Sequence, residues 1–410
     1  MVTIFPLGEF TEYEKWILYN FATLPSVYIS YRDNKNGLNL IDLLQISYDD
    51  KLLSFPEALQ KLVRFGWIKR YNYGFNVHNI IQEVIIRVEG KNIEKCDVLI
   101  SYLYSQLDKA WNNEKFLGLE YIPFAQNIFD IFEATPHHGL GILYNNVGVT
   151  YEDTIGDYKK SLELSLISLK IREVLNNKPE LSSAYNNLAT TYRYLGDYEK
   201  ALEFANKALS MRLELFGELN EYVGNTYQTI SIIYRRLGKL DDAVHCCLKA
   251  IEIRQKLAEN PESDKKLARL YNNISIIYRN LKSYDKSIKY AQESIEIKEK
   301  YYPNDFASLA VSYSTIAVVL REVGRLKEAL YFAEKDLDIM NNLYDSQKHP
   351  DFASTYNNLA MIYFDKSDFV RSLYYSDLEF DILKTHYEDN HPEFDEALQI
   401  RNKIIAKLKA

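Results

Sequence analysis

YNNLATTYRYLGDYEKAL, from Tyr185 to Leu202, is the stretch that decides the fold. Counted from Tyr185, apolar or small residues stand at offsets +3, +4 and +7, which is one stripe of a 3.6-residue helix. Gly196 then allows this helix to end in a left-handed cap, and a second helix follows. The small Ala201, at offset +16, lets the two helices approach closely. The stretch therefore predicts a helical hairpin.

The same pattern occurs six times along the chain, at a spacing of 41 to 44 residues. Lys282 and Ser367 take the place of the turn glycine in two later units, and the first unit has one extra residue in its turn. Self-similarity at a fixed period predicts stacked helical hairpins, that is, an all-α solenoid. The leading residues are Tyr144, Tyr185, Tyr227, Tyr271, Tyr313 and Tyr356.

The composition agrees with a packed helical chain and narrows the classes of function. Of the 410 residues, 47% are hydrophobic and 26% are charged, which excludes a disordered or collagen-like chain. The 34 tyrosines predict aromatic packing between the repeated elements. The formal charge of −8 disfavours non-specific nucleic-acid binding, because such binding depends on neutralising phosphates.

Other motifs point away from catalysis and from membranes. The three cysteines have no paired spacing, and the chain shows neither a signal-peptide pattern nor a run of 18 apolar residues, so we expect a cytoplasmic protein without membrane contact. We expect no catalytic residue, cofactor or metal, because no phosphate-binding loop, nucleophile or metal-ligand motif occurs. Since His245, Cys246 and Cys247 are contiguous on a helix, we expect core packing there rather than a metal site.

Taken together, the six units resemble the tetratricopeptide repeat, in the variety of about 42 residues found in kinesin light chains. The resemblance covers residues 141–390 and implies a right-handed superhelix whose first helices line a concave groove. Residues 391–410 form one amphipathic helix that we expect to cap the last repeat, or else to continue into a longer native chain. Residues 91–140 are expected to form a degenerate helical pair that joins the repeats to the preceding domain.

Residues 1–90 do not share the repeat. Helical patterns over residues 12–26, 37–47 and 54–70 precede a hairpin around Asn72 to Gly74 and a closing helix over residues 79–90. Pro56 suits the first turn of the third helix and Gly66 its end. This order predicts a small winged-helix domain. DNA binding is disfavoured, because the domain has nine basic and ten acidic residues.

LYNFATLPS, LVRFGWIKR and FNVHNIIQEVI within these residues resemble the winged-helix segment of STAND NTPases, the superfamily of the NLR immune receptors. In that family a Met-His-Asp motif contacts bound nucleotide. The matching residues here are Val77, His78 and Asn79, so the resemblance implies that His78 is a nucleotide sensor. Because the sequence has no phosphate-binding loop, it also implies a nucleotide-binding domain outside these 410 residues, in cis if the chain is a fragment.

Two further offsets on the first helices predict a binding surface. Offsets +1 and +8 are two helical turns apart and lie on one face, beside the packed stripe. Amides there would form hydrogen bonds with the backbone of an extended peptide, and arginines would bind its acidic side chains. The alternative is that these residues brace neighbouring helices. The predicted groove residues are Asn145, Asn186, Arg193, Gln228, Arg235, Asn272, Arg279, Arg321 and Asn357.

Two functions remain open from the sequence. The first is a non-catalytic recognition module: the ligand-sensing region of a STAND- or NLR-like protein, for which the resemblance implies a bacterial source and antiviral defence. The second is a stand-alone, peptide-responsive regulator or scaffold whose winged helix docks a partner or DNA. In both, the favoured partner is a protein or peptide with an acidic or extended segment, and nucleic acid is a weaker option.

Overall fold

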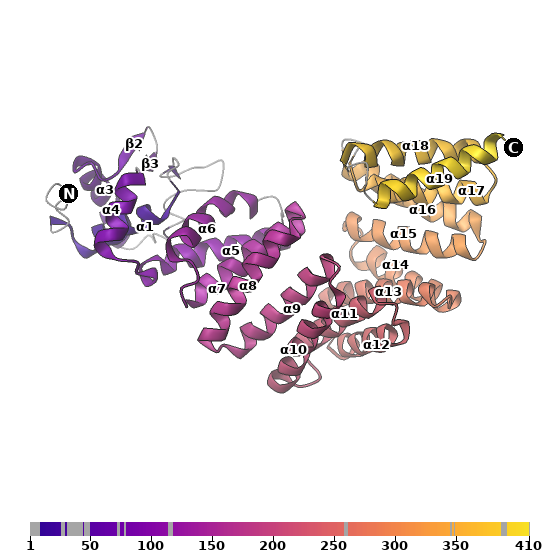
Figure 1. The fold of residues 1–410 in the computed structure, drawn as a ribbon, viewed down its shortest axis with the longest axis horizontal. Helices are drawn as coiled ribbons and strands as arrows, with labels where there is room; N and C mark the ends of the chain where they lie inside the picture. Colours follow the sequence, from indigo (N-terminus) through magenta and orange to yellow (C-terminus); the bar gives the residue numbers. More distant parts are fainter. Residues whose placement is uncertain are drawn as a thin grey trace. The chain divides into compact units, whose positions relative to one another are not determined.

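The computed structural model describes residues 9–25, 29–30, 44, 50–71, 74–77, 79–113, 118–257, 261–344, 347, 349–386 and 392–409 (Figure 1). The chain forms two compact units, residues 1–211 and 212–410, and each is described by itself. Almost all of the described elements are helices, so the expected all-α solenoid class is confirmed.

The first unit begins with two helices, a small sheet and a third helix. They are α1 (Glu12–Thr23), β1 (Ile29–Ser30), α3 (Asp50–Arg64), β2 (Lys69–Tyr71), β3 (Gly74–Asn76) and α4 (Asn79–Glu89). A 3-10 turn, Ile93–Cys96, leads into α5 (Asp97–Asn113) and α6 (Gly118–Phe132). Three helices of the repeats follow: α7 (His138–Thr150), α8 (Tyr158–Leu175) and α9 (Lys178–Tyr194).

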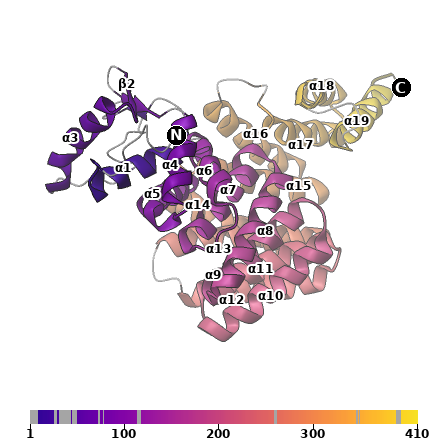
Figure 2. The same ribbon diagram turned by 60° about the vertical axis from the view of Figure 1, so that its left-hand side comes forward.

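The second unit continues the helical pairs. Its boundary falls within α10 (Tyr198–Phe216). The pairs are α11 (Glu221–Arg236) with α12 (Leu240–Leu257), α13 (Pro261–Asn280) with α14 (Tyr284–Tyr301), α15 (Phe306–Glu322) with α16 (Leu326–Leu343), and α17 (Phe352–Asp365) with α18 (Phe369–His386). The last helix, α19 (Pro392–Lys409), packs against α18 and ends the chain (Figure 2). Its role as a cap stays a prediction.

The sheet in residues 1–90 is antiparallel, with the order β1-β3-β2. The expected hairpin is therefore present as β2 and β3, with Arg70 opposite Phe75, while β1 adds a strand that the sequence pattern did not indicate. The expected helix over residues 37–47 lies outside the described residues, apart from Leu44. The winged-helix assignment stays a prediction.

The expected start of the third helix was wrong. α3 begins at Asp50, so Pro56 lies inside the helix rather than in its first turn. A proline there removes one backbone hydrogen bond, and its ring crowds the carbonyl group four residues earlier. The burial of Phe55, Leu59 and Leu62 against the core holds the helix across that gap. Gly66 does end the helix in the left-handed region, with a φ of 77°.

One hydrophobic core runs from Phe10 to Ile171 without a break. It includes Trp67 of the N-terminal domain, Ile100 of α5, Ile128 of α6 and Leu143 of α7, all of them buried. The packing thus continues across residues 90 and 140, and the expected domain boundaries there stay a prediction.

The tyrosine excess has a structural explanation. In four of the repeats an aromatic residue of the second helix lies against the tyrosine at offset 0 or +7 of the first helix, with nearly parallel rings at offset +7. This confirms that the tyrosine pattern reports packing within the repeats. The parallel pairs are Tyr192 with Phe204 at 5.5 Å, Tyr278 with Tyr290 at 5.7 Å, and Tyr363 with Tyr375 at 5.7 Å.

Cys246 takes the corresponding aromatic position in the third repeat, where it is buried. Cys247 lies in the core of that repeat, while His245 is exposed. Core packing is therefore confirmed for the two cysteines but was wrong for His245, because successive residues of a helix point in different directions.

The turns within the repeats confirm the expected left-handed caps. Gly196, Gly238 and Gly324 have φ values of 80°, 72° and 80°. Lys282 and Ser367 occupy the same conformation, with φ values of 58° and 63°, although a side chain disfavours it. In the first repeat a π-helical turn, Tyr151–Ile155, accommodates the extra residue before the turn.

Within residues 212–410, the first helices of neighbouring repeats pack against one another: α11 with α13, α13 with α15, and α15 with α17. The predicted binding residues of this unit lie on these same first helices. None of the helices in the described part of the chain combines the length and hydropathy that a bilayer-spanning segment needs.

Candidate functional site

The residues at offset +1 lie at the edge of the packed stripe. Asn145, Asn186, Gln228, Ser314 and Asn357 are half-buried, and Asn272 is 4% exposed. The regular helix places all of them on the same side of their first helices, because each follows a leading tyrosine that packs inward. The expected amide row is therefore present in each unit.

Some of these polar groups connect neighbouring first helices. Asn187 of α9 donates from Nδ2 to Oδ1 of Asn145 in α7, at 2.7 Å. In the second unit, Asn358 of α17 donates to the hydroxyl of Ser314 in α15, at 2.9 Å. In both cases the donor is at offset +2 of the following repeat. Some of the polar side chains at offset +1 therefore form hydrogen bonds that hold neighbouring first helices together.

Two of the amides keep an acceptor without a hydrogen bond. The Oδ1 atoms of Asn186 and Asn272 are buried, and neither has a hydrogen-bond partner among the described residues. Buried polar atoms in folded proteins normally have a partner. These two amides therefore hold hydrogen-bonding capacity that the bracing contacts do not use.

The arginines at offset +8 are all half-buried, and they fall into two groups. In the second unit, Arg279 Nε lies 3.9 Å from Glu322 Oε1, and Arg321 Nη1 lies 3.2 Å from Asp365 Oδ2. Each carboxylate comes from offset +9 of the next repeat. Arg235 occupies the same helical position in α11.

Arg193, in the first unit, has aromatic neighbours instead. Its guanidinium lies over the ring of Tyr194 at 3.8 Å, and that ring stacks on Tyr158 at 4.9 Å. The residue at offset +8 in the first repeat is Glu152, which accepts hydrogen bonds from Thr191 at 2.7 Å and Ser161 at 3.3 Å. Burial raises the pKa of Glu152.

Sequence reasoning missed the residue that lies between the amide and the arginine. Offsets +1, +5 and +8 share one helical face, and every residue at +5 is half-buried. In the second unit all of these residues are apolar, so each first helix presents an amide or hydroxyl, an aliphatic or thioether side chain, and a basic or aromatic one. The signal was readable, since it repeats at the same period: Val149, Thr190, Ile232, Ile276, Val318 and Met361. We call offsets +1, +5 and +8 of α11, α13, α15 and α17 the recognition lane.

His78 lies outside the described residues, so its predicted role as a nucleotide sensor stays a prediction.

Comparison with known proteins agrees with the repeated helical hairpins. A tetratricopeptide repeat model matches residues 139–214, 180–256 and 266–342. These segments are tetratricopeptide repeats. No curated protein matches the sequence.

Three solved structures show the repeat array in other proteins. A STAND protein with a tetratricopeptide repeat sensor from Pyrococcus horikoshii is 16% identical, and the match covers 98% of this chain and 61% of that one, with a TM-score of 0.54. The apo quorum sensor NprR from B. thuringiensis is 15% identical over 80% of this chain and 93% of that one, with a TM-score of 0.53. A putative kinesin light chain from Podospora anserina is 17% identical over 50% and 96%, with a TM-score of 0.39. At these identities the likeness to the first two structures shows the fold alone, and the third, with a TM-score below 0.5, supports no argument.

A second polar feature of the tetratricopeptide repeats lies inside the array. Four second helices carry a buried cation at equivalent positions: Arg172, Arg212, Arg254 and Lys298. Three of them donate to a backbone carbonyl oxygen in the first turn of the following repeat. The pairs are Arg172 with Glu180, Arg212 with Tyr222, and Lys298 with Ser308. Arg254 binds Glu221 and Asn225 of its own repeat instead. A buried cation thus ties each of these second helices to a first helix.

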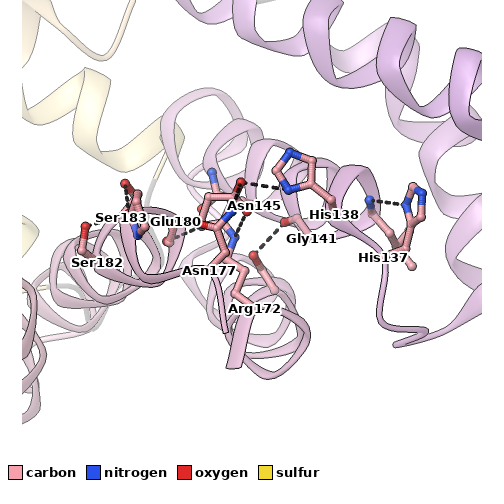
Figure 3. A network of polar contacts seen from close by, with 12 residues as sticks. His137, His138, Gly141, Asn145, Arg172, Asn177, Glu180, Ser182 and Ser183 are labelled. Atoms are coloured by element: carbon pink, nitrogen blue, oxygen red, sulfur yellow. Dashed lines mark hydrogen bonds and ion pairs between the residues drawn. The ribbon is translucent and has the colours of Figure 1, made fainter. Parts of the chain in front are cut away.

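Figure 3 shows this arrangement where α7, α8 and α9 meet. Arg172 Nη1 donates to the carbonyl oxygen of Glu180 at 3.0 Å, and the Glu180 carboxylate lies 2.9 Å from His138 Nδ1. Asn177 caps α9 and also donates to Glu180, at 3.0 Å. The second helix of one repeat and both first helices are therefore joined by one polar network.

The fifth repeat departs from this pattern. It has Met340 where the cation would stand, and one helical turn earlier it has the buried Asp336. Burial raises the pKa of the Asp336 carboxyl to about 7, and the hydroxyl of Thr355 lowers it only in part. Sequence reasoning missed the four buried cations of the second helices. A basic residue that recurs at one offset in an otherwise apolar stripe was a readable signal for them.

Proposed function

We propose that the recognition lane binds an extended, acidic segment of a protein or peptide, and that the protein is a sensor of that ligand rather than an enzyme. The observation that supports this most is the lane itself: four consecutive first helices repeat the same half-buried face. The amides can form hydrogen bonds with the backbone of a peptide, and the aliphatic residues can contact every second side chain of an extended peptide. The arginines can bind its carboxylates in a fixed geometry.

The arginine contacts support an acidic ligand. Glu322 and Asp365 already place carboxylates beside Arg279 and Arg321, which are 28% and 21% exposed. These ion pairs are still partly open to solvent, which screens them and lowers their contribution to stability, so an incoming carboxylate can exchange with them. A ligand would therefore compete with these two acidic residues, and removing their charge should strengthen its binding.

The first unit carries its own set, Asn145, Asn186 and Arg193, for which we propose the same role in a separate contact. The fold neighbours with TM-scores above 0.5 are described as a quorum sensor and as a protein with a repeat sensor. Since the match spans 61% of the STAND protein, we further propose that this chain acts with a nucleotide-binding domain, which ligand capture would regulate.

The test uses two labelled decapeptides, one alternating Glu and Ala and one alternating Lys and Ala, with binding followed by fluorescence anisotropy. The full chain should bind the Glu peptide and ignore the Lys peptide. The combined variant Arg235→Glu, Arg279→Glu and Arg321→Glu should weaken binding at least tenfold, because three attractive charges become repulsive. Glu322→Gln with Asp365→Asn should tighten it.

The matched control reverses three exposed basic residues on second helices: Lys249→Glu, Lys289→Glu and Arg371→Glu. It changes the net charge equally and should lose much less affinity. Equal losses in both triple variants would mean that binding follows net charge alone, and the lane assignment would be wrong.

Bracing is the second candidate role, and the ion pairs and the Asn358–Ser314 contact favour it. It makes a different prediction. If the arginines only brace, then Glu322→Gln with Asp365→Asn lowers the unfolding midpoint without strengthening peptide binding. Circular dichroism on the same variants separates the two roles.

A further inference from the structure

Asp336 is a buried carboxyl at the junction of the fifth and sixth repeats. It lies on α16 and is 1% exposed. Its Oδ2 accepts a hydrogen bond from the hydroxyl of Thr355 on α17, at 2.9 Å. Its Oδ1 is also buried, and it has no hydrogen-bond partner in the part of the chain that the structure describes. Half of this carboxyl is therefore unsatisfied at an interface between repeats.

The equivalent position in other repeats shows what the site accommodates. Ser168 and Ser294 occupy it, and their hydroxyls donate to the carbonyl oxygens of Gly141 and Ala268, each at 2.7 Å. Those carbonyls belong to the residue three positions before the leading tyrosine. Ala208 and Ala250 occupy it in two further repeats and Glu379 in the last, so the position holds a hydrogen-bond donor in the two serine repeats. A protonated carboxyl can donate, whereas a carboxylate can only accept.

Among the described residues, no nearby charge acts as a counter-ion for Asp336. On α16 itself, Lys335 pairs with Glu299 of α14 at 3.2 Å. Several titratable side chains on the neighbouring elements have partners of their own: Lys298 on α14, Tyr313 and Arg321 on α15, Asp351 at the N-cap of α17, Tyr356 on α17 and Glu379 on α18. An ionised Asp336 would consequently be a buried charge stabilised by one neutral hydroxyl, which is unfavourable.

We propose that Asp336 makes the junction between the fifth and sixth repeats a proton-linked joint. Its protonated form holds α17 to α19 against α15 and α16, and loss of the proton loosens them. Repeat arrays respond locally to such a change, because each repeat contacts only its neighbours.

The direction of the pH effect follows from proton binding. Burial raises the pKa of Asp336 from 3.8 to about 7, so the folded protein binds more protons at this site than the unfolded chain does between those values. Stability from this site is complete below about pH 4 and is lost as the pH rises towards 7. The junction should therefore weaken across the physiological range.

This joint belongs to the junction that also joins α15 and α17, the last two helices of the recognition lane. The Arg321–Asp365 ion pair and the Asn358–Ser314 hydrogen bond cross the same junction. A loosened junction would separate Asn357 from Arg321, so proton binding would regulate ligand capture; this consequence alone rests on the proposed function. The joint itself is tested without any ligand.

The experiment is urea unfolding of the full chain between pH 5 and pH 8, for wild type, Asp336→Asn and Asp338→Asn. Asparagine keeps the shape and can donate at any pH, and Asp338 is an exposed control on the same helix. The unfolding constant of the wild type should rise by roughly tenfold more than that of Asp336→Asn between pH 6 and pH 8. Asp338→Asn should follow the wild type. Parallel curves for wild type and Asp336→Asn would overturn the proposal.

Two measurements on the wild type keep the test decisive if Asp336→Asn folds poorly. Carbon-13 NMR of labelled aspartate should show one carboxyl that titrates near pH 7. If all aspartate carboxyls titrate below pH 5, the proposal is refuted. Hydrogen exchange, corrected for its intrinsic pH dependence, should accelerate in α17 and α18 relative to α13 and α14 between pH 6 and pH 8. Equal acceleration in both pairs would exclude a local joint.

Discussion

The junction between the fourth and fifth repeats and the one between the fifth and sixth are built on the same plan with opposite charges. Lys298, which is 3% exposed, donates to the hydroxyl of Ser312 at 2.7 Å, and Asp336 accepts from that of Thr355. Both hydroxyls directly precede a leading tyrosine. Two buried positions one helical turn apart on the second helix thus reach the equivalent hydroxyl with opposite charges, because a hydroxyl can both donate and accept.

The two junctions differ in how well the buried group is satisfied. Lys298 also donates to the carbonyl oxygen of Ser308 at 2.8 Å, whereas Asp336 has one oxygen without a partner among the described residues. Burial lowers the pKa of Lys298 to about 8 and raises that of Asp336 to about 7, so each group is pushed towards its neutral form. The comparison teaches that neighbouring joints of one array can respond to pH in opposite directions.

The largest effect is expected from removing Lys298 at the junction of the fourth and fifth repeats, where the buried group is better satisfied. Lys298→Ala should lower the free energy of unfolding by about 3 kcal/mol, because it leaves a cavity and removes the donor to Ser308 and Ser312. Lys298→Met keeps the stem and should cost about 1 kcal/mol. Urea unfolding measures both. Lys289→Ala, on the exposed side of the same helix, is the control, and an equal loss there would show that the buried contacts contribute nothing special.

A pH series sharpens the comparison. Since the pKa of Lys298 is lowered from 10.5 to about 8, the folded protein binds fewer protons at this site than the unfolded chain between those values. Its contribution to stability should therefore rise with pH across that window, opposite to Asp336. Relative to Lys298→Met, the unfolding constant of the wild type should fall by roughly tenfold or more between pH 8 and pH 10. A flat difference between the two proteins would contradict the assignment.

The smallest expected effect concerns the turns and should leave both junctions unchanged. Lys282→Gly and Ser367→Gly should each raise the free energy of unfolding by about 1 kcal/mol, because glycine adopts the left-handed conformation without the strain of a side chain. Thermal unfolding by circular dichroism detects this. The pH dependence should not change in either variant, and a changed pH profile would mean that the turns are coupled to the buried charges.

Much of the array was predictable because it repeats. The leading tyrosines, the small residue at offset +16 and the turn glycines defined six hairpins, and the left-handed turns occur where those glycines predicted them. Helical periodicity also located the amides and arginines on one face. The start of α3 was predicted wrongly, since a local preference of Pro56 for a first turn yielded to burial of the surrounding apolar residues.

The sequence by itself determined the hairpins and their period, because helix stripes and turns are set by residues close together in the chain. Only the tertiary structure decided which side chains became buried charges and which arginines met carboxylates. Those outcomes depend on pairs such as Asp336 with Thr355 or Arg321 with Asp365, which lie on different helices. Desolvation and pairing between helices act only once the chain is folded, so a local pattern can mark a candidate position but does not fix its partner.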